Sequence, residues 1–391
     1  MQRINIAICC DAINFVAGCF VSTIRFAERL SKKGNKVILI SSRYPGTAEI
    51  EKYKGMKLYR LSAFPVPKSK KKLYFAYPHP NAIQNILKKE KIDVLHFMVP
   101  TPLSISAVSA AKKLGIKVVG HSHTQPENWA VYLPKIFEMT KGTLIELSYD
   151  YIIKLFERSD AVICPSRFAE KMLLTRGLKR KTYVISNGVD TKKFRKKDSS
   201  DCLKKYRLSP GKKKMLFVGR LDPEKNIPVL IHAMKYIERK FSDFEVCIVG
   251  AGTMQRELEG LAKALNVHDK VKFLGRVTDK ELVGIYNMCD IFVLPSLVEL
   301  EGMVVLEAMS CGKPLLIANS PDSASSLFIS KNGFLFDPNN PKDLALKALK
   351  ILQDDKLSKR MSVESYAKSK EYDINKSVSR LEEVYAEIIG A

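Results

Sequence analysis

The chain has 391 residues, of which 46% are hydrophobic, so it can build full cores and is not a disordered chain. Its length suits two domains of about 150–200 residues each. The eight cysteines form no C-x-x-C pair and show no Cys/His ligand spacing, which argues against a zinc site and predicts a reducing, cytoplasmic environment. Neither a signal peptide nor an apolar run of about 18 residues, long enough to span a membrane, is expected.

Charge is concentrated in the first half of the chain. Residues 1–200 hold 36 basic and 15 acidic residues, a net charge of +21, whereas residues 201–391 hold 29 and 26, a net charge of +3. Solubility alone would not separate the charge in this way. The first half is therefore predicted to face an anionic partner, which can be a membrane surface, a nucleic acid or an acidic substrate.

Short β-rich runs alternate with helical patterns along the chain, which predicts βαβ units and parallel sheets. In the first half the predicted strands are 4–9, 36–41, 94–98, 117–120, 161–164 and 182–185, and the predicted helices are 21–33, 81–89, 104–114 and 166–176. The second half continues with predicted strands 214–218, 245–249, 271–274, 291–294 and 314–318. The predicted fold class is α/β, with two doubly wound Rossmann-like domains that bind ligands at the carboxyl ends of their strands.

The predicted boundary between the two domains is the stretch 191–213, which is rich in Lys, Arg and Asp and has the composition of a linker. The N-terminal domain is expected to span 1–190 and the C-terminal domain 214–372. A last helix is predicted over 375–389, with apolar residues at helical spacing.

Two cations follow the predicted strand 214–218, in the string G-R-L-D-P-E-K-N at residues 219–226. Arg220 can hold a phosphate through two parallel N–H bonds, and Lys225 supplies a point charge. Taken alone, two cations after a strand are more often a solvated turn. They lie just after a strand, where a doubly wound sheet binds its ligands. The surrounding string, followed by a helix predicted over 228–240, favours an anion site.

A second motif places two carboxylates, Glu299 and Glu307, eight residues apart around a glycine. Gly302, Met303 and Val304 open the helix between them, and the N-terminus of a helix favours phosphate oxygens. For Glu307 the alternative is an ordinary residue on a helix surface. For Glu301 that surface interpretation is the one we adopt.

In this order and at this separation, the two motifs resemble the nucleotide-sugar site of retaining glycosyltransferases of family 4, which have the GT-B fold of two Rossmann-like domains facing across a cleft. The resemblance spans almost the whole chain. It implies that Arg220 and Lys225 bind the departing diphosphate and that Glu299 accepts hydrogen bonds from the donor sugar, so that all three are catalytic residues. It also implies that Glu307 binds the ribose, that the backbone at Val277 contacts the base, and that the terminal segment 373–391 returns to the N-terminal domain.

In the first half, the resemblance assigns His123 to the cleft, where a histidine positions the donor sugar and the acceptor. A lone histidine is usually structural, and we expect that of its neighbour His121. Gly18 matches a glycine loop after the first strand, where the backbone approaches the diphosphate closely. The usual preceding glycine is replaced here by Ala17.

Two stretches of the first half combine basic and aromatic residues, as an anionic membrane surface requires. One holds Trp129, the only tryptophan of the chain, and Phe137. The other spans residues 68–77 and holds Lys70, Lys71 and Lys72, followed by three aromatic residues. For the Trp129 stretch, core packing is an equally good interpretation, and both remain open.

The leading hypothesis is a cytoplasmic, peripheral membrane enzyme. By resemblance to bacterial diacylglycerol glucosyltransferases and phosphatidylinositol mannosyltransferases, it would move a hexose, glucose from UDP-glucose as first choice, to a lipid such as diacylglycerol or monoglycosyl diacylglycerol. It would use no metal and no cofactor beyond the sugar nucleotide. One alternative keeps this donor and uses a soluble sugar phosphate or inositol phosphate as acceptor. The other is a nucleic-acid-binding protein, which the net charge of +24 suggests but no recognisable module supports.

Overall fold

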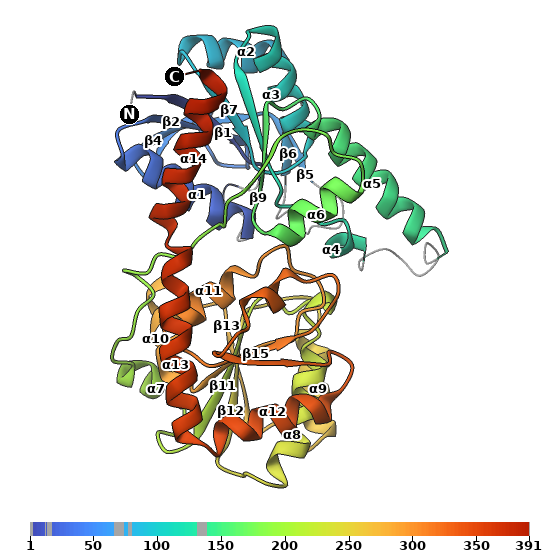
Figure 1. Ribbon diagram of the computed structural model, residues 1–391, viewed down its shortest axis with the longest axis vertical. Coiled ribbons are helices and arrows are strands. Elements are labelled where there is room, and N and C mark those ends of the chain that lie inside the picture. Colours follow the sequence, from blue (N-terminus) through green and yellow to red (C-terminus); the bar gives the residue numbers. More distant parts are fainter. Residues whose placement is uncertain are drawn as a thin grey trace. The chain divides into compact units, whose positions relative to one another are not determined.

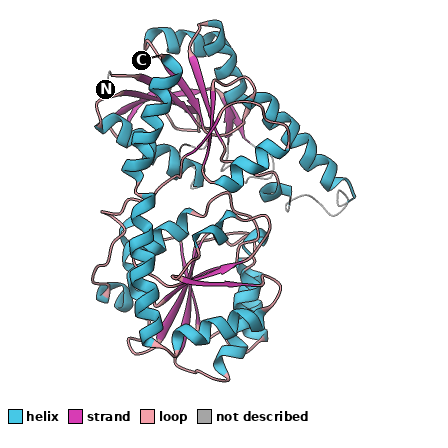
Figure 2. Ribbon diagram, viewed as in Figure 1, coloured by secondary structure: helices cyan, strands magenta, loops and turns pink. Residues whose placement is uncertain are grey.

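The structure is a computed structural model that describes residues 3–11, 13, 18–65, 74–76, 80–130 and 139–390. The chain divides into two compact units. Unit 1 comprises Met1–Asn187 and Ile374–Ala391, and unit 2 comprises Gly188–Asp373. In each unit helices surround a sheet (Figure 2). None of the helices that the structure describes is both long and apolar enough to cross a lipid bilayer.

Unit 1 is built on a sheet with the strand order β10-β9-β8-β7-β1-β2-β4-β3. Its strands are β1 (Asn5–Cys9), β2 (Lys36–Ser42), β3 (Ile50–Tyr53), β4 (Met56–Leu61), β7 (Val94–Phe97), β8 (Lys117–His121), β9 (Ala161–Cys164) and β10 (Thr182–Val184). All neighbours are parallel except β3 and β4. Strands β5 (Ala63–Pro65) and β6 (Tyr74–Ala76) form a separate antiparallel pair. The order reverses at β1, with β7 on one side and β2 on the other, and polar ligands bind at such a switch point.

The helices of unit 1 are α1 (Gly18–Lys32), α2 (Pro80–Lys89), α3 (Pro102–Lys113), α4 (Glu127–Ala130), α5 (Lys141–Phe156), α6 (Arg167–Thr175) and α14 (Ile374–Ile389). Although α14 is the last helix of the chain, it lies beside α1 (Figure 1). Its apolar face joins the core of unit 1 through Ile374, Val378, Leu381, Val384 and Tyr385. The helix forms because these residues recur every three or four positions, and it is stable because unit 1 buries them.

Unit 2 has an all-parallel sheet with the order β13-β12-β11-β14-β15-β16. Its strands are β11 (Lys213–Val218), β12 (Phe244–Val249), β13 (Val271–Gly275), β14 (Ile291–Leu294), β15 (Leu315–Ala318) and β16 (Gly333–Phe336). Its α-helices are α7 (Ser200–Lys205), α8 (Ile227–Glu238), α9 (Gln255–Ala264), α10 (Asp279–Met288), α11 (Met303–Ser310), α12 (Pro341–Leu352) and α13 (Asp355–Ser369). Numbered from β11, the order is 3-2-1-4-5-6, which is that of dinucleotide-binding folds. The switch point lies between β11 and β14.

Residues 191–213 are part of unit 2, whereas the sequence predicted a linker there. Phe194 and Leu208 are buried in the core of this unit, and α7 lies between them in the chain. The stretch was predicted to be a linker because most of its residues are charged or polar, and two isolated apolar residues did not indicate a buried segment. The α/β class and the parallel sheets are as predicted.

Candidate functional site

The loop after β11 holds Arg220 between two buried carboxylates. Its Nη1 donates to Asp222 Oδ2 at 2.6 Å, and its Nη2 donates to Glu224 Oε1 at 2.5 Å. The side chain of Arg220 remains 44% exposed, whereas those of Asp222 and Glu224 are 7% and 0% exposed. These two hydrogen bonds hold the guanidinium of Arg220 in one orientation, while part of the side chain stays exposed to solvent.

Glu224 was not predicted as a site residue. Burial raises the pKa of its carboxyl group, and the positive charges of Arg220 and Lys225 act against that rise. Its Oε2 is buried without a hydrogen-bond partner among the residues that the structure describes. The backbone carbonyl oxygen of Glu224 accepts a hydrogen bond from the N–H of Leu297 at 2.9 Å. This bond connects the loop after β11 to the loop after β14.

Lys225 and Glu299, which the sequence placed in separate motifs, form an ion pair with an Nζ–Oε1 distance of 2.7 Å. Their side chains are 13% and 16% exposed. The backbone of Glu299 is fixed as well, since its N–H donates to Asp322 and its carbonyl oxygen accepts from Ala324. The pair therefore joins the carboxyl ends of β11 and β14, the two strands that meet at the switch point.

Gly302 makes the sharp turn that starts α11. Its φ of 95° lies in the left-handed region, and a Cβ atom there would overlap the hydroxyl oxygen of Ser325. That hydroxyl donates to the carbonyl oxygen of Glu301 at 3.1 Å. The turn therefore requires glycine, and it sets the half-buried Met303 and Val304 in the first turn of the helix.

Glu307 and Glu301 are both buried, with exposures of 5% and 3%. Glu307 lies in α11, and its Oε2 accepts a hydrogen bond from the hydroxyl of Tyr286 on α10 at 3.0 Å. The surface interpretation adopted for Glu301 is thus wrong, because the turn at Gly302 directs the chain into the unit at that point. Tyr286 was not predicted, since nothing in the local sequence links it to Glu307.

The loops after β12 and β13 complete this edge of unit 2. Val277, two residues beyond β13, is half-buried against the core. After β12, Gly250 and Gly252 lie so close to the first loop that a Cβ on either would overlap the backbone of Gly219 or Leu221. These two glycines were not singled out, although a G-x-G directly after a predicted strand was a usable signal.

In unit 1, His123 lies two residues beyond β8, at the carboxyl edge of the sheet. Its ring stacks on that of His121 with centroids 4.2 Å apart. Burial lowers the pKa of His123 to about 3, so its imidazole is neutral at physiological pH. Its Nε2 is buried and has no hydrogen-bond partner in the described part of the chain. Gly18 is the first residue of α1, the helix that follows β1, and it is exposed.

Most of the residues expected at a membrane or acceptor surface are not among those that the structure describes. Lys70, Lys71, Lys72, Phe137 and the side chain of Trp129 lie outside the described residues. The backbone of Trp129 belongs to α4, which begins at Glu127.

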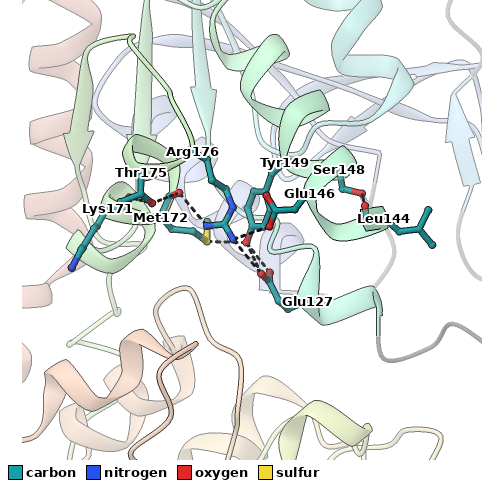
Figure 3. Close-up of polar contacts among 9 residues, drawn as sticks. All are labelled: Glu127, Leu144, Glu146, Ser148, Tyr149, Lys171, Met172, Thr175 and Arg176. Carbon is teal, nitrogen blue, oxygen red and sulfur yellow. Dashed lines mark hydrogen bonds and ion pairs between the residues drawn. The ribbon is translucent and has the colours of Figure 1, made fainter. Parts of the chain in front are cut away.

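A cluster of polar side chains holds the start of α4 (Figure 3). The hydroxyl of Tyr149 on α5 donates to the Glu127 carboxylate at 2.7 Å. The guanidinium of Arg176 lies over the Tyr149 ring, 3.7 Å from its centroid, and 3.9 Å from a Glu127 oxygen. The start of the Trp129 segment is therefore fixed to α5 and to the end of α6.

Among the described residues, no three His, Cys, Asp or Glu side chains gather as they would around a metal ion. The side chains that do converge are two cations and several carboxylates at the switch point of unit 2, and a neutral histidine at the edge of unit 1. The first group can bind an anion beside a hydroxyl-rich ligand, and the second can exchange hydrogen bonds without carrying charge.

Comparison with known proteins gives two family matches that follow one another along the chain. Residues 16–193 match the family described as Glycosyltransferase Family 4, and residues 199–369 match Glycosyl transferases group 1. Among curated relatives, alpha-monoglucosyldiacylglycerol synthase of Streptococcus pneumoniae is 26% identical over 78% of this chain and 69% of its own length.

Solved structures give the same fold. Sucrose-phosphate synthase from Thermosynechococcus elongatus superposes with a TM-score of 0.81 at 20% identity, over 99% of this chain and 100% of that one. Anabaena HepE in complex with UDP and glucose superposes with a TM-score of 0.79 at 18% identity, over 98% and 100%. Because the two family matches together span nearly the whole chain, and because its two sheets superpose on these structures, the chain belongs to the glycosyltransferases of the GT-B fold.

Proposed function

We propose that the chain is a retaining, metal-independent hexosyltransferase that moves a hexose, glucose as first choice, from a nucleoside diphosphate sugar to the hydroxyl group of a membrane lipid. The observation that carries the donor half is the convergence of Arg220, Lys225 and Glu299 at the switch point of unit 2. UDP is the preferred nucleotide because HepE, of the same fold, was crystallised with UDP and glucose.

The donor chemistry follows from the charges of the site. A sugar nucleotide has an anionic diphosphate, which the exposed edge of Arg220 and the ammonium of Lys225 would bind, with the start of α11 adding the positive end of a helix dipole. Glu299 would accept hydrogen bonds from hydroxyls of the sugar. Glu307, oriented by Tyr286, would accept them from the ribose.

Retention of configuration would follow from attack on the same face that the diphosphate leaves. The acceptor oxygen forms a bond to the anomeric carbon while the bond from that carbon to the phosphate oxygen breaks, and the departing phosphate oxygen takes the acceptor's proton. Arg220 and Lys225 stabilise the charge that develops on the diphosphate, which is commonly the largest catalytic contribution. The two carboxylates would bind hydroxyls and would not serve as the acid and base of a glycosidase.

A lipid acceptor is favoured by two observations. The relative from Streptococcus pneumoniae is by name a monoglucosyldiacylglycerol synthase. The first 200 residues also carry a net charge of +21, which an anionic membrane surface would attract. Diacylglycerol or monoglycosyl diacylglycerol is the proposed acceptor, and the neutral His123 would position it against the donor sugar. The enzyme would act as a peripheral protein on the cytoplasmic face of the membrane.

The second candidate has the same donor site and a soluble phosphorylated acceptor, such as a sugar phosphate or inositol phosphate, whose phosphate the basic half would bind. The nucleic-acid-binding alternative has no support, since both halves match glycosyltransferase families.

Mass spectrometry of reaction products tests these choices. The purified chain would be given mixed sugar nucleotides with vesicles of extracted lipid in one reaction and with soluble phosphorylated sugars in another. We expect a lipid product heavier by one hexose, formed with UDP-glucose as donor. A hexose found only on a soluble acceptor would replace the lipid proposal by the second candidate, and no transfer to either class would refute both.

A further inference from the structure

Three histidines of unit 1 form a column of imidazole rings that ends at His123. His96 lies in β7, and its ring stacks on that of His121 at the end of β8 with centroids 5.3 Å apart and planes 7° from parallel. The ring of His121 in turn stacks on that of His123, at 4.2 Å. The pairing of His96 with Val119 places the side chains of His96 and His121 on one face of the sheet, because side chains two residues apart in a strand share a face.

The inner end of the column is fixed by Tyr385 of α14. The hydroxyl of Tyr385 is 2.6 Å from Nδ1 of His96, and the two rings meet edge to face. Phe26 of α1 packs against the ring of His121. The column therefore runs from the C-terminal helix, through the core, to the carboxyl edge of the sheet. His96, His121 and Tyr385 are all buried.

All three imidazoles are neutral at physiological pH. Burial lowers the pKa of His96 to about 3, with a further contribution from His123, and burial lowers that of His123 to about 3. Burial followed by the charges of His123 and His96 places the pKa of His121 well below its ordinary value. Tyr385 stays protonated, since burial and then Glu382 raise its pKa. These rings and Glu382 are the titratable groups that act on the column in the described structure.

We infer that His96, His121 and Tyr385 are positioning residues that fix the half-buried ring of His123 at the carboxyl edge of the sheet. The inference rests on the proposed function, in which that ring meets the substrates. The ring of His123 stacks on His121, which is itself held by His96 and Phe26, and this contact limits its rotation. An imidazole that holds its orientation loses less entropy when it forms a hydrogen bond in the transition state. The C-terminal helix thus contributes to the site through two intermediate rings.

The experiment compares two replacements of His121 in the full chain. His121→Phe keeps a ring face for His123 to stack on, whereas His121→Ala removes it. With lipid vesicles and UDP-glucose as substrates, we expect His121→Ala to lower kcat at least tenfold with less than threefold change in the donor KM. We expect His121→Phe to stay within threefold of wild type.

A second measurement, by NMR, follows the protonation state of His123 in the absence of substrate. The chain has six histidines, so their ring signals in a protein labelled at histidine Cε1 can be assigned by single substitutions. We expect the wild-type His123 signal to stay that of a neutral ring down to pH 5, and to shift and titrate near pH 6.5 in His121→Ala but not in His121→Phe. Tyr385→Phe should alter the tautomer signals of His96. Tyr59→Phe, which removes another buried hydroxyl of the same sheet, should not.

A wild-type His123 that protonates near pH 6.5, or signals and kcat that do not change in a folded His121→Ala protein, would overturn the inference. Failure of the proposed function is recognised separately. If His123→Ala itself kept full transfer, His123 would not be a substrate-positioning residue, whereas the ring signals would still decide whether the column holds it.

Discussion

Lys225 shows how a side chain can be both charged and fixed. Its ammonium is 2.7 Å from Glu299 and only 13% exposed, so the two charges interact in a medium of lower effective dielectric than water. A lysine at the surface would spread over many rotamers, and ordering it would cost conformational entropy during each catalytic cycle. The ion pair confines the ammonium to the switch point of unit 2, where the proposed diphosphate would depart.

We expect Lys225→Ala to lower kcat by about 10²–10³-fold, because a fixed charge that stabilises the leaving group acts in the transition state. The donor KM should change less. Glu307→Ala should also lose most of the transfer. The matched control is Lys213→Ala, which removes another paired lysine, 2.9 Å from Asp355, at the amino end of β11. Near-wild-type turnover by a folded Lys225→Ala protein would remove Lys225 from the site.

At Gly302 the addition of a single methyl group should have a large effect on stability and on activity. We expect Gly302→Ala to lower the free energy of unfolding by about 2–4 kcal/mol, from a left-handed φ of 95° and an overlap with Ser325. Urea unfolding followed by circular dichroism measures this change. Transfer should fall as well, because the turn sets the start of α11.

Gly260→Ala is the control for that substitution. Gly260 lies within α9, where nothing approaches the position of an added Cβ, so alanine should stabilise the helix by up to about 1 kcal/mol. Equal effects of the two substitutions would show that the turn at Gly302 tolerates a side chain.

At the scale of elements, Glu90 joins three parts of unit 1. It follows the last residue of α2, and its carboxylate accepts hydrogen bonds from Tyr59 and, at 2.9 Å, from Lys57, both on β4. It also pairs with Lys36 of β2 at 2.8 Å. Burial acts to raise the pKa of Glu90, but these three partners prevail and lower it to about 2. The ionised carboxylate is therefore a stabilising group of this edge of the sheet.

We expect Glu90→Gln to reduce the free energy of unfolding at pH 7 by about 1–3 kcal/mol. Because the pKa is lowered on folding, the stabilisation is complete above the unfolded value of 4.5 and is lost as pH falls through about 2. Urea unfolding of both proteins at pH 7 and at pH 3 measures the difference, which should shrink at the lower pH. A difference that is the same at both values would contradict an ionic contribution.

Most central strands of both sheets were predicted because they are continuous apolar runs, as parallel strands buried on both faces require. The edge strands β3 and β16, and β4 next to β3, were not predicted. Residues 50–53 have a mixed pattern, and β16 begins with a glycine, a residue that is depleted in strands. Such short elements form because a neighbouring strand is present and not because of their own sequence.

The candidate site shows the same division. Arg220, Lys225, Glu299 and Glu307 stand in local motifs that can be read directly. The pairing of Lys225 with Glu299 spans 74 positions, and that of His96 with Tyr385 spans 289, so no local pattern reports them. Glu224 was not singled out from the sequence, and its burial and its ion pair identify it as a partner of Arg220.

At the scale of the whole molecule, the proposed mechanism needs no metal ion. Transfer should therefore survive treatment with EDTA, because Arg220 and Lys225 would supply the positive charge that a divalent ion provides in other phosphoryl-leaving reactions. Initial rates would be measured after EDTA treatment and after adding back Mg²⁺ or Mn²⁺. Partial stimulation by these ions is compatible with the proposal, since they also screen anionic lipids. Complete loss on chelation with full recovery on adding a metal would show that the mechanism is wrong.

The concentration of charge in the first half predicts how the molecule meets its acceptor. With a net charge of +21 over residues 1–200, the chain should bind vesicles that contain anionic lipid and release them as salt rises, because the attraction decays within about 8–10 Å at physiological ionic strength. Flotation of the protein with vesicles at increasing salt measures this binding.

Replacing Lys70, Lys71 and Lys72 together by neutral residues should weaken vesicle binding at low salt, at about 1 kcal/mol for each lysine near the surface, and leave donor affinity unchanged. Replacing Trp129 should weaken the binding that persists at high salt, which would come from apolar insertion. The same number of exposed cationic residues neutralised on α13, at Lys356, Lys359 and Arg360, is a control for the loss of charge alone. A protein that ignores anionic vesicles at low salt and glycosylates a water-soluble phosphorylated acceptor would refute the lipid proposal, whereas the donor site at Arg220, Lys225 and Glu299 would stand.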